Sequence, residues 1–238
     1  MAAYQAHYEK LKDNVAKYET VLDPLICKEV ELTTMNDDMH FVFCDFVYQV
    51  LLPFFRDSSI RDVLGAENTI SSSDLCYQTS DLEDTVDESI LPPSGVVPFH
   101  GISLYASPLC YLYDDPIILF NIFKKLYTRY FYKLHNLCPH DEENILGLSV
   151  LFEKILLEME PNLTHHFLSN GIQPIRLVFK WLFRAFSGYL TPDQVLHLWD
   201  RILGFDTLKV LPLLAVGILA FRKNNLYQVT TTSAAEVS

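Results

Sequence analysis

Histidine, cysteine and acidic side chains carry the chemistry that is open to this chain, and two groupings of them could suggest a metal site. A Cys-Pro-His-Asp segment occupies residues 138–141, and His165 is followed directly by His166. A protein metal site needs three or four ligands, and no second cluster has a matching spacing. The sequence therefore predicts no metal site, and we expect no cofactor.

Motifs for covalent chemistry and for nucleotide binding are equally weak. A Cys-His nucleophile pair stays open as an alternative, but no cysteine lies in a motif that would activate its thiol. The chain has no glycine-rich phosphate loop, so we expect it not to bind a nucleotide by itself. The five cysteines are far apart and lack C-x-x-C spacing, which favours reduced thiols and a cytoplasmic location.

Charge and hydropathy exclude two further classes of function. The net charge is −12, which disfavours nucleic acid because such binding depends on Lys and Arg. No leader-like apolar segment follows a basic one at the N-terminus. The most hydrophobic stretch, 210–221, is shorter than the ~20 residues that a membrane span needs, so we expect a buried helix there and no transmembrane segment.

Apolar residues recur every three or four positions, which predicts an all-α fold. Asp115-Pro116 has the form of a helix start, and so does Thr191-Pro192 with Gln194 as a capping box. We expect helices at about 4–18, 36–53, 116–134, 145–159, 176–187, 192–203 and 208–224.

One stretch breaks this pattern. Residues 62–95 contain eight acidic residues and no Lys or Arg, and Ser and Pro are frequent. We interpret about 57–94 as an acidic, mobile insertion in one domain that covers 36–225. A helical extension at 1–35 and a loose tail at 226–238 complete the predicted organisation.

The segment from Gly171 to Asp200 is the most specific part of the sequence. It contains a Gly-Ile-x-Pro start, a helix with Trp181, a Leu-Thr-Pro turn, and then Val-Leu-x-x-Trp-Asp ending at Trp199 and Asp200. Tryptophans on helix faces are usually core residues, so we expect Trp181 and Trp199 to define the fold and not to catalyse. Asp200 is expected to pair with a basic residue or a helix end.

The order and spacing of this segment resemble the C-terminal block of TBC domains, which are all-α, multi-helix Rab GTPase-activating proteins. Three other segments (NDDMHFVF, PFHG and AFSGYLTPDQ) resemble one particular member type of that family. The resemblance implies a Rab-family small GTPase in its GTP-bound form as the partner. It also implies peripheral contact with endomembranes through that GTPase.

In the family's usual mechanism, an Arg from an Ile-x-x-Asp-x-x-Arg motif and a Gln from a Tyr-x-Gln-Gly motif enter the nucleotide site. The first motif maps onto Thr34-x-x-Asp37-x-x-His40, so Asp37 matches as an orienting carboxylate or a plain helix cap. The second maps onto residues 98–101, which puts His100 in the Gln position. Both finger positions are therefore histidine.

A neutral histidine is shorter than Arg and has fewer donors, so weakened catalysis is expected. Arg56 and Arg61 could act as a substitute finger if they lie in a surface loop, although solvated charges are the ordinary interpretation. We therefore predict a GTPase-activating or GAP-like protein for Rab GTPases. The alternatives are an inactive TBC scaffold that acts as an adaptor in membrane trafficking and, less favoured, a lipid-handling helical protein.

Overall fold

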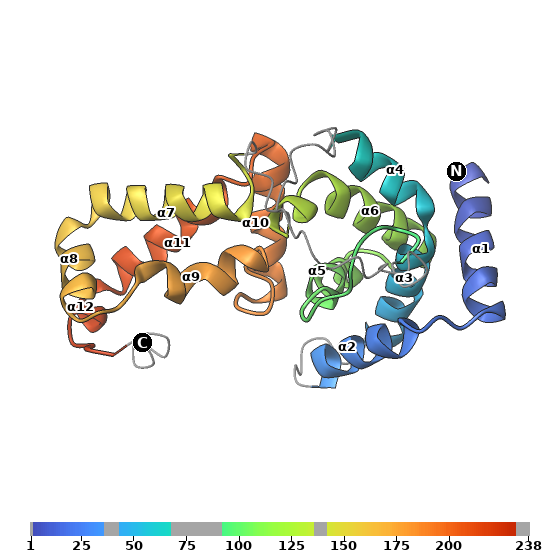
Figure 1. Cartoon of the computed structure of the whole chain (residues 1–238), viewed down its shortest axis with the longest axis horizontal. Coiled ribbons are helices and arrows are strands. Elements are labelled where there is room, and N and C mark those ends of the chain that lie inside the picture. The colour runs from blue at the N-terminus through green and yellow to red at the C-terminus, as the bar shows by residue number, and fades with distance from the viewer. Residues whose placement is uncertain (1, 36–42, 68–91, 136–141, 232–238) are drawn as a thin grey trace, which may run out of the picture. The chain divides into compact units, whose positions relative to one another are not determined.

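The computed structural model describes residues 2–35, 43–67, 92–135 and 142–231, and within these ranges the chain is helical and contains no strand (Figure 1). The predicted all-α fold is confirmed. The chain forms two compact units, Met1–Thr128 and Arg129–Ser238. We describe each unit by itself.

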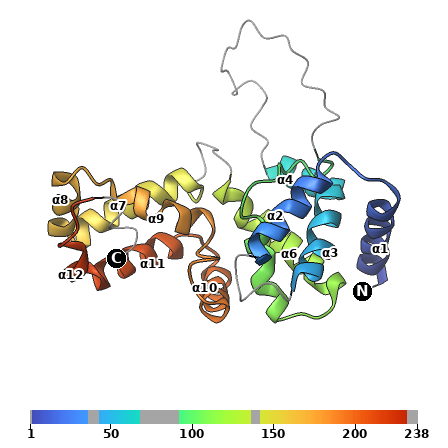
Figure 2. The same ribbon diagram turned by 90° about the horizontal axis from the view of Figure 1, so that it is seen from below.

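Unit 1 is built around one amphipathic helix, α3 (Cys44–Arg56). Its apolar face is buried, and Phe54 makes edge contacts with the rings of Phe123 and Tyr127. Helix α3 lies between α1 and α2 and packs against both (Figure 2). The other elements of the unit are α1 (Ala2–Lys17), α2 (Asp23–Met35), α4 (Ser58–Glu67), α5 (Ser103–Ala106), η3 (Ser107–Tyr111) and α6 (Pro116–Arg129).

Unit 2 has a core of three mutually packed helices, α7 (Ile145–Met159), α9 (Pro174–Phe183) and α11 (Val210–Phe221). Its remaining elements are η4 (Phe131–Leu134), α8 (Pro161–Ser169), α10 (Pro192–Phe205) and α12 (Lys223–Leu226). None of the described helices of either unit is both long and apolar enough to cross a membrane.

The helix-start signals in the sequence are confirmed by the hydrogen bonds that they make. The Asp115 carboxylate accepts from the Ile117 N–H at 2.8 Å, directly before α6. The Thr191 and Gln194 side chains form the expected capping box at the start of α10. These bonds satisfy N–H groups that have no partner inside the helix.

Unit 1 differs from the sequence expectations in three places. Helix α2 was not among the expected helices: Asp23-Pro24 follows the end of α1 at Lys17, but it also begins a new helix. Ser58–Glu67, near the start of the expected insertion, form α4, in which Ile60 and Leu64 are buried. The rest of that insertion up to 91 lies outside the described residues.

The third correction concerns Pro53, where a helix was expected to end. Helix α3 continues through Pro53 to Arg56. A proline has no N–H to bond to the carbonyl four residues earlier, which here is Gln49. That carbonyl instead accepts the hydroxyl of Tyr8 from α1 at 3.0 Å. A contact from another helix therefore supplies the donor that proline removes.

Candidate functional site

Trp199 lies on α10 with its neighbours Val195, Leu198 and Ile202, and all four are buried as predicted. The Trp199 indole N–H donates to the carbonyl of Ala185 at 3.1 Å. Its ring also packs on Phe131, with centroids 4.8 Å apart. The described contacts of Trp199 are those of a core residue.

The carbonyl that Trp199 holds belongs to an unusual turn after α9. Ala185 and Phe186 both adopt left-handed backbone conformations, with φ of 44° and 63°. Such conformations cost about 1–2 kcal/mol for residues other than glycine. Trp181 is half-buried and packs on Phe186 and Tyr189. Trp181 precedes this turn in the sequence and Trp199 follows it, and both contact the turn.

Asp200 does not behave as expected. It is exposed on α10 and makes no hydrogen bond or ion pair with the residues that the structure describes. The following acidic residue in this region, Asp206, is the one that pairs: it accepts from Arg129 at 2.8 Å and from Tyr130 at 2.6 Å. The pairing predicted for Asp200 with a base or a helix end is not found among the described residues.

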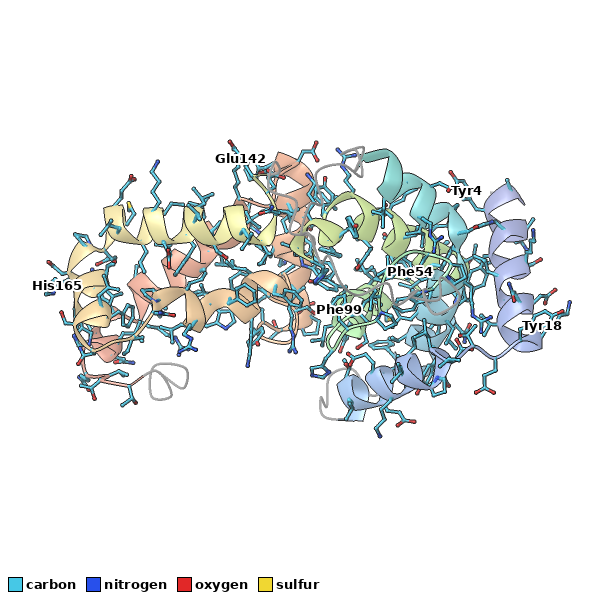
Figure 3. The ribbon with its side chains drawn as sticks, viewed as in Figure 1. Tyr4, Tyr18, Phe54, Phe99, Glu142 and His165 are labelled. Atoms are coloured by element: carbon cyan, nitrogen blue, oxygen red, sulfur yellow. The ribbon has the colours of Figure 1, made fainter. Side chains whose placement is uncertain are left out.

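His100 lies on the turn that leads into α5, directly after Phe99, which Figure 3 labels beside that helix. Its side chain is 67% exposed, and its Nδ1 lies 2.8 Å from Oε2 of Glu29. The next residue, Gly101, has a φ of 103°, a conformation that favours glycine. The Gly101 N–H donates to Oε1 of Glu29 at 2.6 Å.

Glu29 is thus the residue that organises this turn, and the sequence analysis did not identify it. It lies on α2 with a side chain that is only 9% exposed, on the face that also buries Ile26 and Val30. Its Oε1 accepts from the hydroxyls of Thr33 at 3.1 Å and Ser103 at 3.0 Å. A carboxylate at helical spacing between the apolar residues Ile26 and Val30 and Thr33 was the signal that could have identified it.

Asp37 and His40, the candidates from the first motif, lie outside the described residues. Helix α2, which carries Glu29, ends at Met35, so the segment with both candidates follows it directly in the chain. Of the two histidines expected at finger positions, the described structure therefore includes His100.

Arg56 does not lie in a surface loop. It ends α3, is buried, and pairs with the Asp23 carboxylate and with the carbonyl of Tyr18 at 2.7 Å. Its Nε is buried and has no hydrogen-bond partner among the described residues. Swinging Arg56 outward would leave Asp23 without its charge partner, so the described position is structural.

Arg61 is exposed on α4, and one of its guanidinium nitrogens donates to the carbonyl of Pro92 at 3.1 Å. This contact joins two residues near the opposite ends of the acidic stretch. Its acceptor is a neutral carbonyl and not a carboxylate. Arg61 is thus the more accessible of the two candidate substitute fingers.

A metal-binding arrangement is not found among the residues that the structure describes. His166 donates from Nε2 to the carbonyl of Val229 at 2.9 Å, and Nδ1 of its neighbour His165 lies 3.3 Å from the Ser169 hydroxyl. Residues 138–141 lie outside the described ranges. Neither described histidine shares an ion-binding geometry with another potential ligand.

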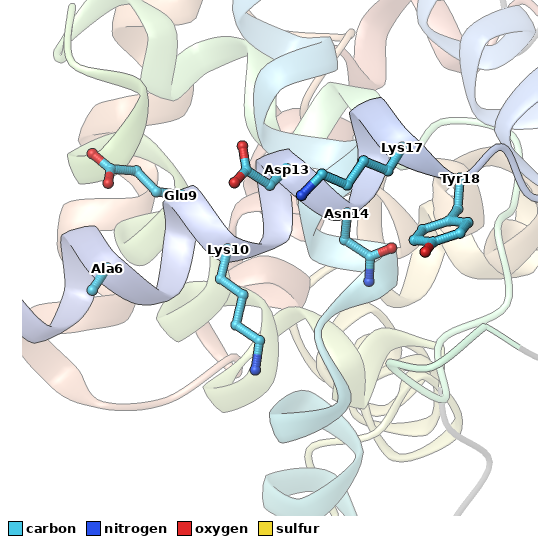
Figure 4. Close-up of a pocket in the computed structure, with 7 residues that line it drawn as sticks. All are labelled: Ala6, Glu9, Lys10, Asp13, Asn14, Lys17 and Tyr18. Atoms are coloured by element: carbon cyan, nitrogen blue, oxygen red, sulfur yellow. The ribbon is translucent and has the colours of Figure 1, made fainter.

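A hollow of about 570 Å³ lies along the outer face of α1 (Figure 4). Its described lining comes from this helix and from Tyr18, the residue directly after it, and it carries two acids, Glu9 and Asp13, and two lysines, Lys10 and Lys17. With balanced charge and no buried polar group aimed into it, this face has the character of a solvated helix surface.

Comparison with known proteins assigns the fold to a class. A family model described as the Rab-GTPase-TBC domain matches residues 99–227, which is more than half of the chain. The chain belongs to the Rab-GTPase-TBC domain family. The match begins one residue before His100 and includes both tryptophans, whereas Glu29 and His40 lie ahead of it.

A particular relative is the human (Homo sapiens) protein TBC1 domain family member 19, which is 45% identical to this chain over 230 residues. The aligned part covers 97% of this chain and 43% of the relative, so the chain spans less than half of that protein's length. This is the member type that the PFHG and AFSGYLTPDQ segments indicated. No solved structure matches the chain.

Proposed function

We propose that this chain binds a Rab-family GTPase in its GTP-bound form and accelerates GTP hydrolysis only weakly. The observation that carries this proposal is His100. The motif resemblance assigns it to the position of the family's catalytic Gln, and the structure supports an accessible role: its side chain is exposed, and its Nδ1 contacts a buried carboxylate. A partner GTPase would therefore meet a histidine at this position.

The chemistry of GTP hydrolysis explains why this replacement should weaken catalysis. An arginine finger places a permanent positive charge against the phosphoryl oxygens and is worth ~10³–10⁵ in rate. A glutamine orients the attacking water with an amide that both donates and accepts. With Nδ1 engaged by Glu29, His100 can offer only Nε2, which either donates or accepts.

Single-turnover GTP hydrolysis across a panel of Rab GTPases tests this proposal, with binding to the GTP-bound and GDP-bound forms measured in parallel. We expect preferential binding to one or more GTP-bound Rabs. Acceleration should be several hundred-fold or more below that of a TBC domain with Arg and Gln fingers. Strong acceleration that is lost on His40→Ala would show that a histidine serves as the finger.

Arg61→Ala provides a further arm of the same assay. Activity that is lost on Arg61→Ala, while His40→Ala has no effect, would identify Arg61 as a substitute finger. Arg56→Ala is unsuitable for this purpose, because it removes the buried partner of Asp23 and would lower stability.

A binding adaptor in membrane trafficking is the second candidate function. It is favoured by the single hydrogen-bonding atom that His100 presents, which suits recognition better than the orientation of water. The same assay separates the two functions: an adaptor binds the GTPase without changing the hydrolysis rate, whereas a weak GAP changes the rate measurably.

A further inference from the structure

We propose that Glu29 is a positioning residue, which holds Nδ1 of His100 so that Nε2 is the ring nitrogen presented to a bound GTPase. Its importance for a GTPase rests on the function proposed above. Glu29 lies outside residues 99–227, so the family match assigns it no role. The helix that carries it belongs to the part of unit 1 ahead of that match.

The contact between His100 and Glu29 determines where the proton of the neutral ring lies. A buried carboxylate that already accepts several hydrogen bonds is an acceptor at Oε2, so the 2.8 Å contact requires the His100 proton to be on Nδ1. Nε2 has no partner among the described residues. It carries a lone pair in the neutral ring and an N–H in the charged ring.

Hydrogen bonds hold the Glu29 carboxylate itself in place. A buried carboxylate is costly unless it is hydrogen-bonded, and Oε1 receives the Gly101 N–H and two hydroxyls. One of these hydroxyls, on Thr33, comes from the same helix one turn later, and the other, on Ser103, from the start of α5. The Ser103 hydroxyl also lies 2.5 Å from the Thr33 hydroxyl. Glu29 on α2 therefore orients His100, and Glu29 is itself held by α2, by the turn of His100 and by α5.

The hydrogen bond to Glu29 selects one tautomer of the His100 ring. In a solvent-exposed neutral histidine without a partner, the proton can be on either nitrogen, and the local hydrogen bond decides which one. Here Glu29 selects the Nδ1–H form. Nε2 then accepts a hydrogen bond, as the oxygen of a glutamine amide would, but the donor half of that amide has no counterpart.

Nitrogen-15 NMR of the imidazole rings tests the proton position directly, in the intact chain and without a GTPase. The His100 signal is assigned by its loss in His100→Gln. At a pH where the ring is neutral, we expect the Nδ1–H tautomer in the unchanged protein. An Nε2–H tautomer there would overturn the proposal without the need for any variant.

Glu29→Gln extends this test. A glutamine that accepts the Gly101 N–H with its oxygen turns its NH₂ group toward His100, so we expect the ring to change to the Nε2–H tautomer. Glu31→Gln is the matched control, because it removes the same charge from the same helix at a residue that does not contact His100. The His165 signal, from unit 2, should be unchanged in both variants. An unchanged His100 tautomer in folded Glu29→Gln would overturn the proposal.

The functional arm uses a Rab that binds the unchanged chain. Glu29→Gln should weaken binding or residual acceleration roughly 10- to 100-fold, which is the cost of a misplaced group in a site of this kind, and Glu31→Gln should not. If His100→Ala impairs the response but Glu29→Gln does not, the positioning role is overturned and the proposed function stands. If the chain binds no GTPase, the proposed function is overturned, and the tautomer alone decides whether Glu29 orients His100.

Discussion

At the scale of single residues, Trp199 shows how a family-defining side chain supports a strained turn. Its indole N–H donates to the buried carbonyl of Ala185, in a turn with two consecutive left-handed residues. Strain of that kind persists only where surrounding contacts hold it. The aromatic ring and its single donor therefore have separate tasks, the ring filling the core and the N–H satisfying the turn.

Replacement of Trp199 by Phe removes this donor while keeping an aromatic ring. We expect the loss of about 1–3 kcal/mol of stability from the unsatisfied carbonyl, with a further loss from the smaller ring. Urea unfolding followed by far-UV circular dichroism measures this change. Trp181→Phe is the matched control and should cost less, because Trp181 is half-buried. Equal losses for the two variants would contradict the assigned role of the indole N–H.

Asp57 provides a second prediction at this scale, concerning pH. Burial raises the pKa of this carboxyl, but hydrogen bonds from Lys124, Ser59 and His7 outweigh that effect and leave the pKa below its ordinary value of 3.8. The contacts from Lys124 and from the Ser59 hydroxyl are both 2.6 Å. The ionised form is therefore favoured in the folded state.

A carboxyl whose pKa is lowered by folding contributes stability above its unfolded pKa and loses that contribution as the pH falls through its folded pKa. Asp57→Asn should thus cost about 2 kcal/mol at pH 7, and the difference from the unchanged protein should shrink below pH 3.8. Urea unfolding between pH 7 and pH 3 measures this. A difference that is constant over that range would contradict the assignment.

At the scale of elements, a hydrogen bond joins α1 to α3 at the point where Pro53 interrupts the hydrogen bonds of α3. Pro53 leaves the Gln49 carbonyl without its helical donor, and Tyr8 supplies one from α1. Burial, and to a lesser extent Asp115, raises the pKa of Tyr8 to about 12, so its hydroxyl remains protonated as a donor at neutral pH. The contact therefore explains both the continuation of α3 and the attachment of α1.

A double-mutant cycle tests this pairing. Tyr8→Phe should cost about 1 kcal/mol in the unchanged background, because it leaves the carbonyl unsatisfied. In a Pro53→Ala background, the new N–H can bond to Gln49, so the same change should cost markedly less. The coupling is measured by urea unfolding of the four proteins. Additive effects would mean that Tyr8 does not compensate for the proline.

Signals within one helix were readable from the sequence, and contacts between distant segments were not. Asp115 and the Thr191 capping box are local, so helices α6 and α10 could be predicted from their caps. Helix α2 was missed although its Asp23-Pro24 start has the same form as Asp115-Pro116, because the residues after it do not show a clear apolar periodicity. The burial of Arg56 depends on Asp23, 33 residues earlier, and no local pattern reports such a pairing.

The candidate site divides in the same way. The resemblance to TBC domains placed His100 on a turn, and the structure places it there, exposed. The contact between His100 and Glu29 joins residues 71 positions apart. Spacing along the chain does not predict such a contact, because it depends on how α2 packs against α5. The structure was needed to find the residue that orients the ring.

At the scale of the whole molecule, the family match and the compact units divide the chain differently. The match at 99–227 includes parts of both units, whereas residues 2–35 pack within unit 1 with α3 and α5. The helices ahead of the match contribute Glu29 and the partner of Arg56. The domain limits of 36–225, with an extension at 1–35, remain a prediction, and function is expected to depend on both parts.

Replacement of both histidines by the family's Arg and Gln tests whether they are the cause of the weak catalysis that we propose. Single-turnover GTP hydrolysis by a Rab that binds the chain is compared for the unchanged protein and for the double variant His40→Arg, His100→Gln, with His165→Gln as the control. We expect GTP hydrolysis to be faster with the double variant by about 10³-fold or more and to be unchanged with the control. A double variant that still binds the Rab but gives no gain, or an unchanged protein that is already as fast, would contradict this expectation.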